Sequence, residues 1–229
     1  MTSVRGFVRE NGLGLAFGSA FLVALAGQAV AGHAEFNNEL TADGLQPMGF
    51  GAYLASSDFA VDVMENWQSE YLQFYLYLYL YLTVWLVQRG SPESKALGRE
   101  GHESDEEQRI GRYATADSPR WAGVGGFRQN LYATSLGLVM GGVFVLSWFA
   151  QSITGVAAFN ERRLRGLEAP TNWGGYLGSA DFWSRTLQNW QSEFLAIASM
   201  AVLSIYLRQR GSPESKPVGA PHAATGVAG

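Results

Sequence analysis

The chain has no cysteine and few charged residues. Of its 229 residues, 16% are charged and 47% are hydrophobic, whereas about 25% of an average soluble domain is charged. The missing cysteines exclude disulfide bonds, thiolate metal sites and a thiol nucleophile. Three scattered histidines leave little for a metal site. A net charge of −4 leaves no basic face to neutralise phosphates. We therefore expect no metal, no cofactor and no nucleic-acid partner, and the composition favours a membrane protein.

Four apolar segments predict helices that span a membrane. They cover residues 12–31, 71–87, 131–151 and 194–207. Because a spanning helix needs roughly 20 residues, the first and third segments are long enough, and the second is at the lower limit. The fourth is too short unless it extends upstream through Asn189–Glu193. The lipid bilayer is thus the first expected partner.

Two of these segments have a second interpretation. The run YLYLYLYL at 75–82 alternates strictly, which is typical of a strand. A lone strand among spanning helices would leave backbone groups unpaired in lipid, so we predict a helix. The first segment follows Arg5 and Arg9 and ends in Ala29-Val30-Ala31, which resembles a signal-peptide cleavage site. Its match to an internal segment favours a span.

The sequence is duplicated. Shifted by 123 positions, residues 13–72 match residues 136–195 without a gap, with 23 of 60 positions identical. The longest shared block, NWQSE, occurs at Asn66–Glu70 and again at Asn189–Glu193. Beyond this block the shift becomes 121, because the first copy has an extra Tyr-Leu pair, and both copies end in RGSPESK. Such a match is far beyond chance.

The duplication predicts an all-α membrane protein with four transmembrane helices. These form two parallel two-helix repeats in a pseudo-two-fold bundle, because an even number of spans returns each copy to its starting side. The expected boundaries are 1–97 for the first two-span repeat, 98–120 for a polar cytoplasmic linker, 121–216 for the second repeat and 217–229 for a disordered tail.

The basic residues predict the orientation. The N-terminus, residues 89–128 and the chain from Arg208 onward hold 12 of the 16 lysines and arginines. Because basic residues gather on the cytoplasmic side of a membrane, both termini are expected in the cytoplasm. The segments between the spans of each copy then lie outside.

The duplicated NWQSE blocks carry the candidate site. Helices are expected to begin near Ser56-Ser57 and near Ser179, with serine as the N-cap, and to run unbroken into the second and fourth spans. On a helix, residues four apart share a face. Amide, hydroxyl and carboxylate groups therefore gather at two equivalent places, formed by Asn66, Ser69 and Glu70 and by Asn189, Ser192 and Glu193.

Glu193 gives this site a physical argument. If the fourth span has about 20 residues, Glu193 lies inside the outer edge of the hydrocarbon region. An ionisable group there is costly unless it faces a bundle interior or a water-filled cavity with a partner. We predict a site for a small cation, a proton or a polar solute, with Gln28, Gln151, Asn37 and Asn160 as further members. The alternative is a polar network that only fixes helix packing.

The segments GQAVAGHAEFNNEL, GAYLASSDF, ENWQSEYLQ and RGSPESK resemble an uncharacterised family of small bacterial inner-membrane proteins with duplicated NWQSE and RGSPESK motifs. The likeness covers nearly the whole chain outside the linker and the tail. It implies a multi-pass protein of the bacterial cytoplasmic (inner) membrane, N-in and C-in by the charge argument, and no assigned activity.

Three classes of function follow. The first is a small transporter, channel or sensor with symmetric polar sites near the outer face. Four helices are few for a transport path, so a homodimer is expected in that case. The second is a structural or interaction protein of the cell envelope with no ligand or catalysis. An enzyme ranks last, because the sequence has no Gly-x-Ser-x-Gly elbow, HExxH or P-loop.

Overall fold

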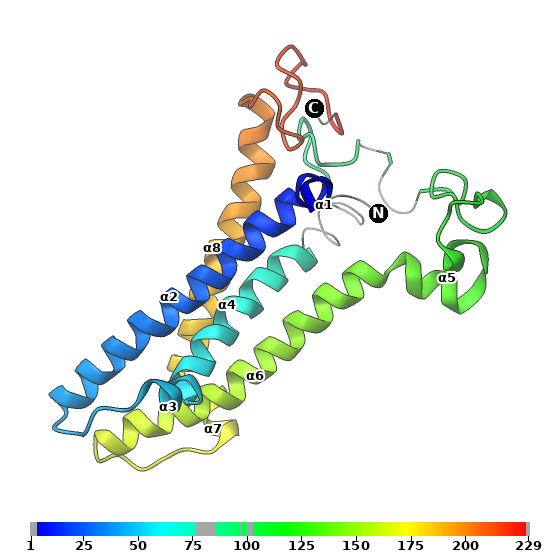
Figure 1. Ribbon diagram of the computed structural model, residues 1–229. Helices are drawn as coiled ribbons and strands as arrows, with labels where there is room; N and C mark the ends of the chain where they lie inside the picture. Colours follow the sequence, from blue (N-terminus) through cyan, green and yellow to red (C-terminus); the bar gives the residue numbers. More distant parts are fainter. Residues whose placement is uncertain (1–3, 77–85, 97, 100–102, 228–229) are drawn as a thin grey trace. The chain divides into compact units, whose positions relative to one another are not determined.

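The computed structural model describes residues 4–76, 86–96, 98–99 and 103–227, and every regular element in these ranges is helical (Figure 1). The prediction of an all-α protein is therefore confirmed. The helices are α1 (Val4–Glu10), α2 (Gly12–Ala42), α3 (Phe50–Leu54), α4 (Ser57–Leu76), α5 (Gly126–Ala133), α6 (Ser135–Arg165), α7 (Trp173–Leu177) and α8 (Ala180–Tyr206), with short 3-10 helices η2 (Gly111–Tyr113) and η3 (Arg120–Gly123).

Helices α2 and α6 are long and apolar enough to cross a membrane. They contain most of the first and third predicted spans, and each has 31 residues. Large apolar side chains such as Leu22 and Leu146 are exposed along them, as lipid-facing residues would be. Both helices continue for roughly three to four turns beyond their apolar segments. Neither extension contains proline, which first follows at Pro47 and Pro170, so nothing in them breaks the helix.

The third span begins later than its sequence suggests. The apolar segment starts at Leu131, but α5 ends at Ala133 and α6 begins at Ser135. Thr134 separates the two helices, because its hydroxyl donates to the carbonyl of Asn130 at 2.9 Å while its φ and ψ of −109° and 5° leave the helical range. Leu131 therefore belongs to a separate short helix.

The second and fourth predicted spans are described to different extents. The second, with its Tyr-Leu run, lies mostly outside the described residues, and α4 is helical as far as Leu76. The fourth forms the C-terminal half of α8, which continues without a break from Ala180 through Glu193. Four membrane spans thus remain a prediction.

The serine caps lie where the sequence predicts them. Ser179 accepts a hydrogen bond from the backbone N–H of Phe182 at 3.2 Å, and Ser56 accepts one from Phe59 at 3.3 Å. Asp58 and Asp181 occupy the first turns of α4 and α8. Each cap satisfies a backbone donor that the first turn leaves free.

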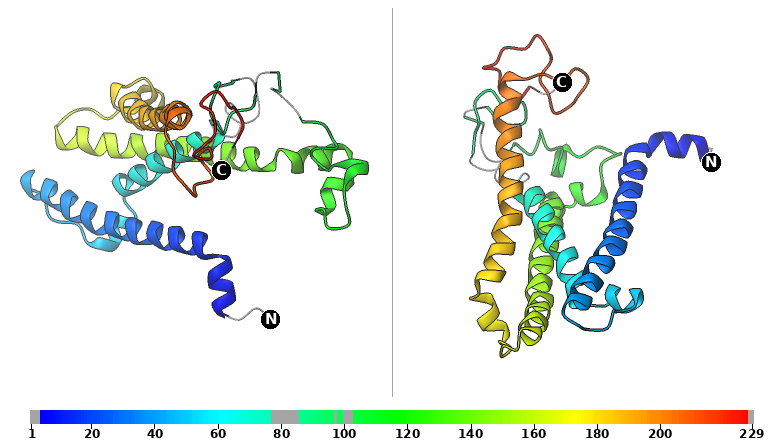
Figure 2. Two further views of the ribbon diagram at one scale, coloured as in Figure 1. Left: turned by 90° about the horizontal axis from the view of Figure 1, so that it is seen from above. Right: turned by 90° about the vertical axis from the view of Figure 1, so that its left-hand side faces the viewer.

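The contacts divide the chain into two compact units. The first unit consists of Met1–Val63 and Ile153–Trp173. In its core, Phe36 and Leu40 of α2 pack against Tyr53 of α3, with Met48 and Phe59 beside them. Figure 2 shows α3 lying beside the end of α2. The chain after α2 is thus held by a small aromatic core.

The second unit consists of Met64–Ser152 and Gly174–Gly229. Here Trp148 of α6 stacks on Phe182 of α8, with ring centroids 6.4 Å apart. The ring of Tyr75 in α4 packs on Gly141 of α6, where a Cβ atom would lie only 2.8 Å from the ring. Aromatic rings and one glycine therefore bring α4, α6 and α8 together.

Candidate functional site

Buried polar side chains line the interior of the second unit. An apolar helix interior usually excludes such groups, because a buried polar atom costs free energy unless it is hydrogen-bonded. They come from all three long helices of this unit and comprise Gln68 and Ser69 of α4, Ser147, Gln151 and Ser152 of α6, and Thr186 and Glu193 of α8. This concentration makes the interior of the unit the candidate functional site.

A hydrogen bond between Trp190 and Gln68 joins α8 to α4. The indole N–H of Trp190 donates to Oε1 of Gln68 at 2.7 Å, and the Gln68 side chain is fully buried. The Trp190 ring also lies 5.3 Å, centroid to centroid, from Trp148 of α6. Nε2 of Gln68 has no hydrogen-bond partner within the described part of the chain. The amide thus has donor protons to offer a water molecule or a solute.

An ion pair lies one to two turns nearer the start of α8. Arg185 donates to Glu65 of α4 at 2.8 Å, and its Nε lies 3.5 Å from Asp181. The hydroxyl of the buried Tyr176 donates to Asp181 at 3.3 Å. Burial and the charge of Asp181 raise the pKa of Tyr176, so the phenol stays protonated. This network ties α4, α7 and α8 together at one end of the polar interior.

Glu193 lies about two turns further along α8, and its side chain is buried. Ser69 of α4 lies within hydrogen-bond reach of its carboxylate, the exposed Glu70 of α4 is near enough to repel it, and the hydroxyl of Ser192 lies 3.5 Å from its Oε1. Two carboxylates beside a hydroxyl form a set of oxygen acceptors. A proton or small cation bound there would offset the repulsion between the two negative charges.

Residues from both predicted triads therefore meet across α4 and α8. The Asn189 amide turns away from the carboxylates, because it donates to the backbone carbonyl of Arg185 at 3.1 Å. The two serines donate to the backbone carbonyls of Asn66 and Asn189 in their own helices, at 3.2 and 2.8 Å. Ligand binding at these residues remains a prediction.

The other predicted asparagines hold loops in the first unit. The Asn37 amide accepts from the N–H of Met48 at 2.7 Å and donates to its carbonyl at 3.0 Å. Asn160 makes the same two bonds to Thr171, at 2.8 and 2.9 Å. Each amide therefore fixes the loop that follows its helix. Gln28 is half-buried on α2 in the same unit.

A comparison of only those residues that are identical in the two copies misses part of the polar interior. Such a comparison identifies Gln151, but three other buried polar residues occur in only one copy. At the positions of Ser147, Ser152 and Thr186 the first copy has Ala24, Ala29 and Val63. A polar residue opposite an apolar one is the signal that could have found them.

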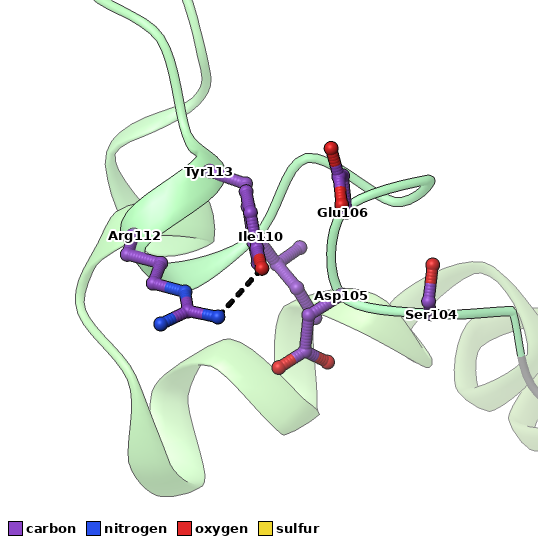
Figure 3. Close-up of a pocket in the computed structure, with 6 residues that line it drawn as sticks. All are labelled: Ser104, Asp105, Glu106, Ile110, Arg112 and Tyr113. Atoms are coloured by element: carbon purple, nitrogen blue, oxygen red, sulfur yellow. Dashed lines mark hydrogen bonds between the residues drawn. The ribbon is translucent and has the colours of Figure 1, made fainter.

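The described residues include no group of three or more histidine or acidic side chains that could hold a metal ion. An open surface hollow occurs in the linker and is lined by Ser104, Asp105, Glu106, Ile110, Arg112 and Tyr113 (Figure 3). Arg112 donates to the Tyr113 hydroxyl at 2.6 Å. The linker carboxylates next to this hollow are exposed, so it offers little to concentrate a ligand.

Comparisons with known proteins identify a family but no activity. Neither the curated proteins nor the solved structures include a match to this chain. A family model matches residues 4–227, nearly the entire length. The chain therefore belongs to the family described as a domain of unknown function, DUF6766.

Proposed function

We propose that this protein is a small transporter or channel of the bacterial cytoplasmic membrane that binds a proton or small monovalent cation at Glu193. The observation that carries the proposal is the buried Glu193 carboxylate of the second unit, which has the buried Ser69 and the exposed Glu70 of α4 as neighbours. Ionisable groups inside a membrane are costly and commonly mark ion or proton pathways. The oxygen atoms around Glu193 suit such a cation.

The proposed architecture is four spanning helices in two parallel repeats with both termini in the cytoplasm. Two helices of suitable length and composition support the membrane location. Helix bounds support the repeats, because α5, α6, α7 and α8 start 122 or 123 residues after the starts of α1, α2, α3 and α4. The remaining two spans would be the end of α4 with the residues after it, and the C-terminal half of α8.

The polar residues of α8 suggest a route from the outer face to Glu193. Asp181, Arg185, Asn189 and Glu193 recur every four residues, so each lies one turn from the next on neighbouring parts of the helix surface. The pair between Arg185 and Glu65 would then lie between the outer face and Glu193. A cation would approach past this pair and bind between the two glutamates.

A homodimer would give this route the additional helices that a transport path needs. A Cβ atom added at Gly14 or Gly18 of α2 would have no neighbouring atom within 4 Å among the described residues. Small residues four apart allow helix backbones to approach closely in lipid. This face of α2 is therefore the proposed seam between two copies.

The proposal is tested in proteoliposomes with an imposed membrane potential. An internal pH dye reports proton movement, and Na⁺ and K⁺ are tested separately. We expect flux of one of these cations in the wild type, its loss in Glu193→Gln, and a reduction in Glu70→Gln. Glu106→Gln, an exposed carboxylate of the linker, is the matched control and should retain flux.

Melting in mild detergent separates a loss of function from a loss of fold. A ligand that binds only the folded state raises the melting temperature, so the wild type should respond to pH or to one cation and Glu193→Gln should not. Flux and melting that respond to no cation in the wild type, or that respond equally in Glu193→Gln, would contradict the proposal.

A structural role in the cell envelope is the second candidate. The observation that favours it is that two predicted site residues, Asn37 and Asn160, form hydrogen bonds to loop backbone rather than to a ligand. In that case Glu193→Gln would be as stable as the wild type or more stable at every pH, since removing a buried charge often stabilises a fold. The same melting experiment therefore distinguishes the two candidates.

A further inference from the structure

The segment between the linker and α6 forms a compact elbow, residues Arg120–Ala133, made of η3 and α5. Gly125 and Gly126 have φ values of 74° and 63°, a conformation that favours glycine. This turn folds η3 back against α5, where the rings of Trp121 and Tyr132 pack edge to face at 6.5 Å. The elbow is therefore a folded element of its own.

The elbow is joined to the start of α6 by Thr134. The backbone N–H and the hydroxyl of Thr134 both donate to the carbonyl of Asn130, at 3.1 and 2.9 Å. Beyond this residue the chain changes direction, and Figure 1 shows α5 turned away from the axis of α6. A helix that continued α6 would keep the direction of its axis, whereas α5 departs from that line.

The elbow exposes apolar and basic side chains together. Phe127 is 79% exposed and Val124 is 56% exposed, and part of the Trp121 ring is accessible. Arg120 and Arg128 are exposed beside them, and residues 118–134 contain no acidic side chain. Water disfavours this apolar surface, and the two arginines add a net positive charge. A lipid surface with negative headgroups satisfies both features.

The N-terminal helix repeats this arrangement in the first unit. Asn11 separates α1 from α2, and its backbone N–H and side-chain amide both donate to the carbonyl of Phe7, at 3.0 and 2.9 Å. Val4 and Phe7 are exposed on α1. Asn11 and Phe7 lie 123 positions before Thr134 and Asn130, so the same bend precedes both long apolar helices.

We propose that the elbow lies in the headgroup region of the cytoplasmic leaflet, with Phe127 and Val124 inserted toward the acyl chains and Arg120 and Arg128 on anionic lipid phosphates. This inference rests on the proposed membrane span of α6. The bilayer is the occupant that continuity favours, because one residue, Thr134, separates the elbow from that span. Aromatic residues such as Trp121 and Tyr132 are typical of this depth.

The absence of cysteine allows a direct test with single nitroxide labels. Labelled Phe127→Cys, Leu146→Cys and Ala116→Cys are reconstituted as full-length protein in vesicles containing phosphatidylglycerol. Electron paramagnetic resonance then compares accessibility to oxygen, which partitions into lipid, and to a water-soluble nickel complex. Leu146 reports the span of α6, and the exposed Ala116 reports the solvated linker.

We expect oxygen to dominate at residues 127 and 146 and the nickel complex to dominate at 116. If position 127 resembles 116 while 146 resembles lipid, the elbow proposal is wrong and the span stands. If 146 also resembles 116, the membrane span and the proposed function fail with it.

Two further samples test the role of charge. In vesicles of phosphatidylcholine alone, and in Phe127→Cys carrying Arg120→Gln and Arg128→Gln, the label should move toward the water-exposed ratio. An unchanged ratio in both would overturn the part of the proposal that assigns the arginines to anionic lipid. A label at Phe7→Cys should give the same accessibility ratio as one at position 127, because α1 exposes the same kind of surface. A water-exposed ratio at position 7 would contradict the idea that the bend before each long apolar helix places a segment on the membrane surface.

Discussion

The two RGSPESK turns have one sequence and two environments. In each turn a serine accepts from the backbone N–H of a glutamine six residues earlier, at 2.9 Å in both Ser94 and Ser215. The following lysines differ. Lys95 pairs with Glu103 at 3.6 Å and is partly exposed, whereas Lys216 is buried. Identical local sequence thus repeats the turn but not the surroundings of its last residue.

The surroundings of Lys216 come from the C-terminal tail. The carbonyl oxygens of Gly90, Pro221, His222 and Ala224 lie 2.6 to 3.3 Å from its ammonium nitrogen and share its three N–H donors. Gly90 belongs to the other copy of the motif, so this one side chain connects both turns to the tail. Nothing in the seven residues of the motif distinguishes the two lysines, and the chain that follows them does.

The largest effect is expected from Lys216→Ala. Removing the ammonium group leaves the buried carbonyl of Gly90 and three partly buried tail carbonyls without their donor, which costs about 2 kcal/mol of stability. Lys95→Ala breaks a partly exposed ion pair with Glu103, and the loss of that pair should cost about 0.5 kcal/mol or less. Melting in mild detergent and hydrogen exchange of residues 217–227 measure the difference. Equal losses in the two variants would remove the contrast between the turns.

A second contrast is between two glutamines of the duplicated NWQSE block. Gln68 is buried and accepts from Trp190, whereas Gln191 is exposed. Gln68→Leu keeps the volume but removes the acceptor, so we expect a loss of about 1 kcal/mol and a shifted Trp190 indole N–H resonance. Gln191→Leu is the matched control and should leave that resonance in place. A shift of the same size in both variants would show that the hydrogen bond does not distinguish them.

The smallest effect concerns two duplicated aspartates. Asp181 has Arg185 as its neighbour, whereas Asp58 lies near both Glu161 and Arg162, whose Nη1 is 4.0 Å away. Burial and the Glu161 carboxylate outweigh the arginine and raise the pKa of Asp58. A raised pKa means that the folded state holds a proton which the unfolded state releases. The stability contribution is therefore full below the unfolded pKa of Asp58 and is lost as the pH rises through its folded pKa.

We accordingly expect the melting temperature to fall as the pH rises through the acidic range above the unfolded pKa of Asp58, about 3.9. Asp58→Asn should flatten this slope, because the amide cannot release a proton, whereas Asp181→Asn should retain it. The measurement is a series of melting curves across this range in one detergent. A slope that persists in Asp58→Asn would assign the pH dependence to another group.

The helices were largely predictable because their signals are local. Serine caps, acidic first turns and long apolar stretches depend on residues a few positions apart, and they placed the starts of α4 and α8 and the bulk of α2 and α6. The error at Leu131 had a local origin as well. Hydropathy counts Leu131 and Tyr132 as part of the span, whereas the hydrogen bond from the Thr134 side chain closes α5 after them, and α6 begins only at Ser135.

The candidate site was predictable only in part. The shortage of apolar residues before Arg208 pointed to Glu193, and the structure places that carboxylate in a buried polar interior. The duplicated sequence, however, pointed equally to both copies of each predicted site residue. The actual neighbours of Glu193 are Ser69 and Glu70 of the other copy, and the Trp190–Gln68 bond likewise joins the two copies.

By itself, the sequence determined an all-helical chain, two helices suited to a membrane, and two copies of one residue pattern. These properties follow from composition and from interactions within a few turns of helix. The tertiary structure alone decided which member of each duplicated pair is buried and what it meets. Gln68 differs from Gln191, and Lys216 from Lys95, because burial and hydrogen-bond partners are supplied by chain segments far away in the sequence.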